Sequence, residues 1–125
     1  MNIQIGVDLV SVTRIEQILK KYPDRFTTRI LSDPEKDVFI AKGARTETLA
    51  AAFAAKEAVL KAIGCGIGPA ALNEVEVLSA TGRQPSVLLH GTAARIAGKK
   101  NITGISISMT HEPPFACAVA VAYKD

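Results

Sequence analysis

The sequence predicts an α+β protein in which helices pack on a mostly antiparallel sheet. Helical patterns are grouped in the first half of the chain, and strand patterns joined mostly by turns follow in the second half. The chain has 125 residues and no internal repeat or long linker, which predicts one domain spanning residues 1–125. Apolar residues make up 48% and charged residues 22%, so a disordered or collagen-like chain is excluded.

The chain begins with a strand followed by a helix. Residues 3–9 alternate between apolar and polar side chains, which predicts a half-buried strand with Asp8 on its polar face, near the C-terminal end. Thr13 and Glu16 have the spacing of a capping box and therefore predict the start of a helix. Its apolar residues recur at helical intervals until Pro23 ends the pattern.

Two further helices are expected before the strands. One is predicted to start at Pro34, with Ser32 or Asp33 as its N-cap, because proline is favoured in a first helical turn. The strongest pattern covers residues 47–63, is rich in Ala and Leu, and ends at Gly64. This helix is apolar nearly all the way round and should be largely buried.

The second half of the chain alternates with a period of two. The elements expected there are a strand around 74–77, a turn at 81–85, a strand at 86–90, a helix at 92–97 bounded by Gly91 and Gly98, a strand at 104–110, a turn at 111–114 and a buried strand at 115–123.

The charge pattern sets limits on partners and location. The 15 Lys and Arg against 12 Asp and Glu give a net charge of +3, which suits an acidic partner or a phosphorylated ligand without singling out nucleic acid. No apolar run approaches the roughly 18 residues of a membrane span, and no signal peptide is expected. The two cysteines fit no metal-ligand spacing, so we expect a reduced, cytoplasmic protein.

Three residues are the leading candidates for chemistry. Glu57 and Lys61 lie about 40° apart on one face of the apolar helix, either as an ordinary ion pair or as functional groups. Asp8 is either a turn residue or, beside Glu57, half of an all-oxygen site. Magnesium favours such a site, with waters and substrate phosphate completing its shell. Sequence spacing alone leaves open whether the two carboxylates meet.

Weaker signals surround this group. Glycines at 64, 66 and 68 favour helix termination and a tight turn over a phosphate-binding loop, because they follow a helix. His111, beside a Pro-Pro turn, is either structural or functional. His90 and the two cysteines are interpreted as structural. A basic cluster around the first helix is either a solvated face or a docking surface for an acidic partner; it consists of Arg14, Lys20, Lys21, Arg25 and Arg29.

Two segments carry a resemblance to a known family. Residues 6–15 (GVDLVSVTRI) and 53–64 (FAAKEAVLKAIG) are similar to two motifs of the holo-[acyl-carrier-protein] synthases, the short bacterial 4'-phosphopantetheinyl transferases. Their order, their separation and the total length fit the family. Gly82 with Pro85, Gly91 and residues 108–118 resemble it more loosely.

The resemblance implies a 4'-phosphopantetheinyl transferase-like fold and an activity. Such enzymes move 4'-phosphopantetheine from coenzyme A to a serine of apo acyl carrier protein in fatty acid biosynthesis, releasing adenosine 3',5'-bisphosphate. It implies magnesium held by Asp8 and Glu57, catalysis by these two residues and Lys61, and coenzyme A in clefts between the subunits of a homotrimer. Lys61, His111 and Arg45 are the implied coenzyme A contacts, and Arg14, Lys21 and Arg25 the implied carrier-protein contacts.

The chain also departs from the family pattern. Ala51 and Ala52 stand where many relatives carry Gly and a basic residue, so Arg45 or Lys42 is expected to supply the phosphate-facing charge. Cys65 stands where Thr is common. The proton acceptor for the serine is left open between Glu57 and a metal-bound water.

Other functions remain as alternatives at this point. A small basic module could bind an acidic protein or nucleic acid without catalysis, although aromatic stacking residues are scarce. A metal-dependent nucleotide hydrolase could share Asp8, Glu57 and Lys61. A structural trimer-forming protein would leave Glu57 and Lys61 unexplained.

Overall fold

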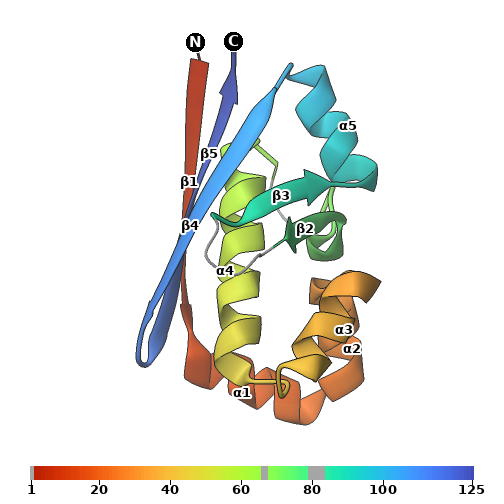
Figure 1. Cartoon of the computed structure of the whole chain (residues 1–125), viewed down its shortest axis with the longest axis vertical. Helices are drawn as coiled ribbons and strands as arrows, with labels where there is room; N and C mark the ends of the chain where they lie inside the picture. The colour runs from red at the N-terminus through yellow and green to blue at the C-terminus, as the bar shows by residue number, and fades with distance from the viewer. Residues whose placement is uncertain (1, 66–67, 79–83) are drawn as a thin grey trace.

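The computed structural model describes residues 2–65, 68–78 and 84–125. Its elements are β1 (Asn2–Ser11), α1 (Val12–Lys21), α2 (Pro23–Ile30), α3 (Asp33–Ala41), α4 (Thr46–Ala62), a 3-10 turn η1 (Leu72–Glu74), β2 (Val75–Leu78), β3 (Ser86–Leu89), α5 (Gly91–Lys99), β4 (Gly104–Glu112) and β5 (Phe115–Lys124). Helix α4 packs along one face of the sheet formed by β1, β4 and β5, and α1, α2 and α3 gather at one end (Figure 1). The predicted α+β class is confirmed.

The main sheet is antiparallel with the strand order β1-β5-β4. Strand β5 lies in the centre, so residue pairs join β1 to β5 and β5 to β4. The two chain termini lie side by side at one end of this sheet (Figure 1). Strands β2 and β3 form a separate antiparallel pair. No helix in the described ranges has both the length and the apolar character needed to cross a membrane.

Apolar and polar side chains alternate along strand β1 as predicted, but the face that carries the polar residues and Gly6 is the one that points to the core. A half-buried strand ordinarily places its apolar side chains inward, whereas here Ile3, Ile5, Val7 and Leu9 are 54–68% exposed. Gly6 and Asp8 face helix α4 instead. A Cβ at Gly6 would collide with the carbonyl oxygen of Ala58, so α4 approaches the strand more closely than a larger side chain permits.

Helix α4 forms the centre of the core, as its apolar sequence predicts. Its buried residues include Leu49, Val59 and Leu60. The inner face of β5 is made of buried alanines at positions 116, 118, 120 and 122, so small residues line the strand side of its contact with α4. The outer face of β5 stays accessible at Phe115 and Val119, so the predicted buried strand is fully buried on its inner face alone in the single chain.

The three N-terminal helices follow the sequence in part. Helix α1 ends before Pro23 as expected, but Ser11 is its cap, with its hydroxyl accepting from the Arg14 N–H; the capping role predicted for Thr13 is wrong. The extended backbone of Ser11, where the strand ends, places the hydroxyl within reach. Ser32 caps α3 in a full capping box, which confirms one of the two predicted caps.

Helix α2 was not expected from the sequence. Pro23 ends the pattern of α1 and also occupies the first turn of α2, where its missing N–H has no intrahelical partner to lose. Phe26 on α2 lies against Phe53 on α4, with ring centroids 6.4 Å apart, so this helix packs on the core.

The strands and helix of the second half lie at their predicted places, with ends that differ from the prediction by at most two residues. Helix α5 includes Gly91 and extends past Gly98, which were expected to bound it. Strand β4 continues through His111, so only the two prolines after Glu112 form the turn. Most of the turn predicted at 81–85 and one of the three glycines, Gly66, lie outside the described residues.

Candidate functional site

The structure brings Asp8, Glu57 and Lys61 together. Asp8 lies on the inner face of β1, where its side chain is only 15% exposed. Lys61 reaches across from α4 and donates to Asp8 Oδ1 at 3.2 Å and to the carbonyl oxygen of Val7 at 3.0 Å. The described ion pair of Lys61 is therefore with Asp8 on the strand, in place of the i,i+4 pair with Glu57 that helical spacing suggests.

The charges of Asp8 and Lys61 both affect the pKa of Glu57. Burial raises the pKa of Glu57 first, and the nearby charge of Asp8 raises that pKa further, while Lys61 acts in the opposite direction. Two carboxylates that repel each other and share one ammonium group form a site with excess negative charge. Such a site is suited to take up a cation.

The donor set of this cluster consists of carboxylate and carbonyl oxygens. Within residues 2–65, 68–78 and 84–125, no group of three or more His, Cys, Asp or Glu side chains is placed to hold a metal ion. Two carboxylates are the number that magnesium commonly takes from protein, because it keeps several waters and binds substrate phosphate. Asp8 and Glu57 match that pattern.

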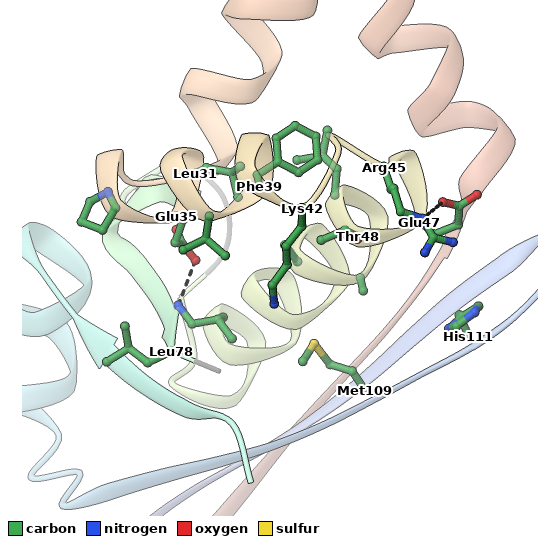
Figure 2. Close-up of a pocket in the computed structure, with 16 residues that line it drawn as sticks. Leu31, Glu35, Phe39, Lys42, Arg45, Glu47, Thr48, Leu78, Met109 and His111 are labelled. Carbon is green, nitrogen blue, oxygen red and sulfur yellow. Dashed lines mark hydrogen bonds and ion pairs between the residues drawn. The ribbon is translucent and has the colours of Figure 1, made fainter. Parts of the chain in front are cut away.

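Arg45 and His111 line a pocket of about 460 Å³ at a different place. Lys42 lines it too, so the pocket has three basic side chains together with the carboxylates of Glu35 and Glu47, and the rest of its wall is mostly apolar. Figure 2 shows Lys42 and Arg45 from the segment between α3 and α4, and His111 on β4. Arg45 pairs with Glu47 at 3.6 Å, with both side chains substantially exposed.

The pocket and the carboxylate cluster lie on opposite sides of helix α4. Glu57 and Lys61 each follow a pocket residue, Thr48 and Ala52, by nine positions, which is about two and a half helical turns. Asp8 also belongs to β1, at the opposite edge of the sheet from β4, which carries His111. Within one chain, the predicted coenzyme A contacts are therefore divided into two separate groups.

The predicted carrier-protein contacts lie on α1 and α2. Arg14, Lys21 and Arg25 are all exposed. Beside them, a groove of about 420 Å³ is lined by apolar and basic side chains, namely Ile18, Tyr22, Arg25, Phe26 and Arg29. An acidic partner with exposed apolar residues would complement this surface.

A second polar group, which no sequence pattern indicated, lies behind the pocket. Lys56 is completely buried, although it carries an amino group. Its partner Glu35 is mostly buried and lines the pocket. His90, which the sequence indicates to be structural, has its Nε2 3.5 Å from Oε1 of Glu76. These pairs join residues far apart in the chain, which spacing alone does not reveal.

A family comparison covers nearly the whole chain. Residues 4–120 match the model of the 4'-phosphopantetheinyl transferase superfamily. The holo-[acyl-carrier-protein] synthase of Desulforudis audaxviator is 43% identical over 122 residues, which cover 98% of this chain and 93% of that protein.

Solved structures agree with this similarity. The holo-[acyl-carrier-protein] synthase from Neisseria meningitidis has 33% sequence identity and a TM-score of 0.88, covering 97% of this chain and 98% of that one. The Helicobacter pylori holo-[acyl-carrier-protein] synthase in complex with coenzyme A has 31% identity and a TM-score of 0.81, covering 95% of this chain and 99% of that one.

Proposed function

The chain belongs to the 4'-phosphopantetheinyl transferase superfamily, as a relative of the holo-[acyl-carrier-protein] synthases, and we propose that it converts apo to holo acyl carrier protein. The carrier serine oxygen bonds to the β-phosphorus of coenzyme A, and the bond from this phosphorus to the bridging oxygen breaks. Adenosine 3',5'-bisphosphate leaves, and the serine proton passes to a base. The reaction serves fatty acid biosynthesis in the cytoplasm.

The observation that carries this proposal is the convergence of Asp8, Glu57 and Lys61. The three side chains come from two distant segments, and those segments are the ones that resemble the family's motifs. Lys61 remains half exposed, so a substrate can reach its ammonium group.

Magnesium fits this cluster, on the evidence of its oxygen donors and of the cation already placed there. The ammonium of Lys61 stands against Asp8 in the position of a counter-ion for the paired carboxylates. Asp8 and Glu57 would hold the metal ion. When bound, magnesium supplies positive charge that neutralises pyrophosphate oxygens and orients the phosphorus for in-line attack.

The residues of this chain then have distinct tasks. Lys61, one helical turn from Glu57, would stabilise negative charge on the departing phosphate as a point charge. Glu57, or a water molecule beside it, would take the serine proton. Asp8 is held by the packing of β1 on α4, which keeps its carboxylate directed toward the helix.

The phosphate-bearing end of coenzyme A suits the pocket lined by Lys42, Arg45 and His111. This pocket offers positive charge for phosphates and an apolar wall for a base. Lys42 and Arg45 would supply the charge that Ala51 and Ala52 do not.

The proposed assembly is a homotrimer with active sites between subunits. An apolar strip covers the outer face of the sheet, comprising Ile3, Ile5, Val7 and Leu9 of β1 with Phe115 and Val119 of β5; we name it the outer sheet strip. Exposed apolar areas of this kind mark interaction surfaces. Within one chain, the pocket and the Asp8 cluster lie on opposite sides of α4. A second copy of the chain could place its own pocket beside the Asp8 cluster of the first.

Carrier docking is assigned to the surface of α1 and α2. Arg14 stands in the first turn of α1, which begins directly after the strand that holds Asp8. A carrier protein bound to Arg14, Lys21 and Arg25 would therefore lie close to the end of the strand bearing Asp8.

Mass spectrometry of the carrier protein tests the proposal. Apo acyl carrier protein incubated with the enzyme, coenzyme A and magnesium should gain one phosphopantetheine group. Replacing Glu57 by Gln should reduce the rate at least about a hundredfold while the fold is retained. Consumption of coenzyme A without a gain in carrier mass would instead indicate a hydrolase, and an unaffected Glu57→Gln variant would remove this residue from the scheme.

A further inference from the structure

A lysine without a role in the proposed reaction is buried behind the pocket. The side chain of Lys56 is 0% exposed, and its ammonium lies between α4 and the elements opposite. It donates to Glu35 Oε1 at 2.7 Å and also to the backbone carbonyl oxygens of Leu72 and Val75. One amino group thus joins α4 to α3, to η1 and to β2.

Glu35 is the other half of this pair, and it faces the pocket. Its Oε1 also accepts from the Ser32 N–H at 2.8 Å, and its Oε2 accepts from the Val77 N–H at 2.9 Å. Figure 2 shows Glu35 at the wall of the pocket with one of its hydrogen bonds. This single carboxylate therefore ties α3 to β2 and, through Lys56, to α4.

A second carboxylate extends the network. Glu76 is 7% exposed, accepts from the Ser32 hydroxyl at 2.7 Å and lies near His90. Burial lowers the pKa of Lys56, while the charges of Glu35 and then Glu76 oppose that change. The lysine therefore has two acidic neighbours, of which Glu35 lines the pocket.

The arrangement matters because the pocket is assigned to an anionic ligand. A negative carboxylate in its wall would repel the phosphates of coenzyme A unless an opposite charge lies close to it. Buried ion pairs are often no more stable than apolar residues of the same size, so stability alone is a weak reason for this pair.

We propose that Lys56 is a positioning residue of the coenzyme A site. It neutralises Glu35 and holds the wall formed by α3 and β2 against the helix that carries Glu57. This inference rests on the proposed function, since it takes the pocket to be the place where the phosphates of coenzyme A bind.

The test compares coenzyme A affinity among variants with a changed pair. Lys56→Met leaves Glu35 charged and unpaired, and should raise the Kd and the KM for coenzyme A about tenfold, with a much smaller change in kcat. The double variant Glu35→Gln/Lys56→Met removes the charge while keeping an amide in its place. Its Kd should return to within about threefold of wild type, because there is no charge left to neutralise.

Further variants serve as controls. Glu35→Gln alone should bind coenzyme A as tightly as wild type or more tightly, because it removes a negative charge beside the pocket. Lys36→Met changes a lysine on the same helix α3 that donates to the Thr28 hydroxyl at 3.1 Å, and should leave the Kd unchanged. Melting temperatures of all variants separate a loss of stability from a loss of binding.

Each outcome supports or overturns the inference. Equal binding by wild type and Lys56→Met would contradict it, as would weak binding by a folded double variant or by Glu35→Gln. If Lys56→Met does not fold, the double variant and Glu35→Gln decide the question by the same criteria. A wild-type protein that does not bind coenzyme A would overturn the proposed function itself, which distinguishes the two failures.

Discussion

The ammonium nitrogen of Lys61 lies 3.2 Å from Oδ1 of Asp8, so a lysine on α4 pairs with a carboxylate on β1. A divalent cation binding to Asp8 and Glu57 would compete with this contact. Its arrival would release Lys61 toward a substrate phosphate. The free protein therefore pairs Lys61, the proposed catalytic lysine, with a carboxylate that is proposed to bind the metal ion.

Replacing Lys61 by Met should strengthen magnesium binding while weakening catalysis. The pair is partly exposed and contributes about 0.2–1 kcal/mol, so the affinity for magnesium should rise roughly 1.4- to fivefold. Titration calorimetry without coenzyme A measures this directly. Unchanged or weaker magnesium binding would show that the lysine and the metal do not compete.

Reversing the charge of Arg14 should weaken the interaction with carrier protein. Arg14→Glu is expected to raise the KM for apo acyl carrier protein about tenfold and leave the Kd for coenzyme A unchanged. Lys99→Glu, an exposed change in α5, is the matched control. If Arg14→Glu and Lys99→Glu gave the same KM for the carrier, α1 would not be the docking surface.

A charge on the outer sheet strip should dissociate the assembly. Ile5 is 68% exposed in one chain, so Ile5→Asp costs little in a monomer but would bury a charge in a trimer. Analytical ultracentrifugation should find wild-type trimers and Ile5→Asp monomers. Leu88→Asp, at an apolar side chain of β3 that is 47% exposed, should remain trimeric. A trimeric Ile5→Asp protein would place the interface elsewhere.

Adding a methyl group at Gly6 should disturb the strand that holds Asp8. The new Cβ would collide with the Ala58 carbonyl oxygen and lie 2.7 Å from the Ala62 nitrogen. Gly6→Ala should lower the free energy of unfolding by about 1–3 kcal/mol, as overpacking does. Gly98→Ala meets no atom within 4 Å and should not destabilise the chain. Chemical denaturation measures the free energy of unfolding of both variants. If Gly6→Ala were as stable as Gly98→Ala, the contact between residue 6 and Ala58 would relax at little cost.

The sequence indicated which residues are candidates for the site, but it did not reveal how far apart they lie in the folded chain. The periods of residues 3–9 and 47–63 predicted the strand and the helix, and hence the elements that carry Asp8 and Glu57. Alternation does not reveal which face of a strand lies inward. The inner face of β1 depends on Gly6, whose close contact with α4 is a tertiary effect.

Two other features lay beyond pattern reasoning for different reasons. Helix α4 has no polar face, so the periodicity of its sequence does not reveal the direction of the Lys56 side chain. The partner of Lys56, Glu35, lies in a different helix, α3. Helix α2 was missed because Pro23 serves as both the end of one pattern and the first turn of the next helix.

Anomalous diffraction from crystals soaked with manganese tests the central claim, that Asp8 and Glu57 hold one divalent cation. Manganese substitutes for magnesium at oxygen sites and gives a signal that locates it. We predict one peak about 2.0–2.2 Å from a carboxylate oxygen of each residue, and its loss in Glu57→Gln. A peak bound to neither carboxylate, or one that persists unchanged in Glu57→Gln, would contradict the account.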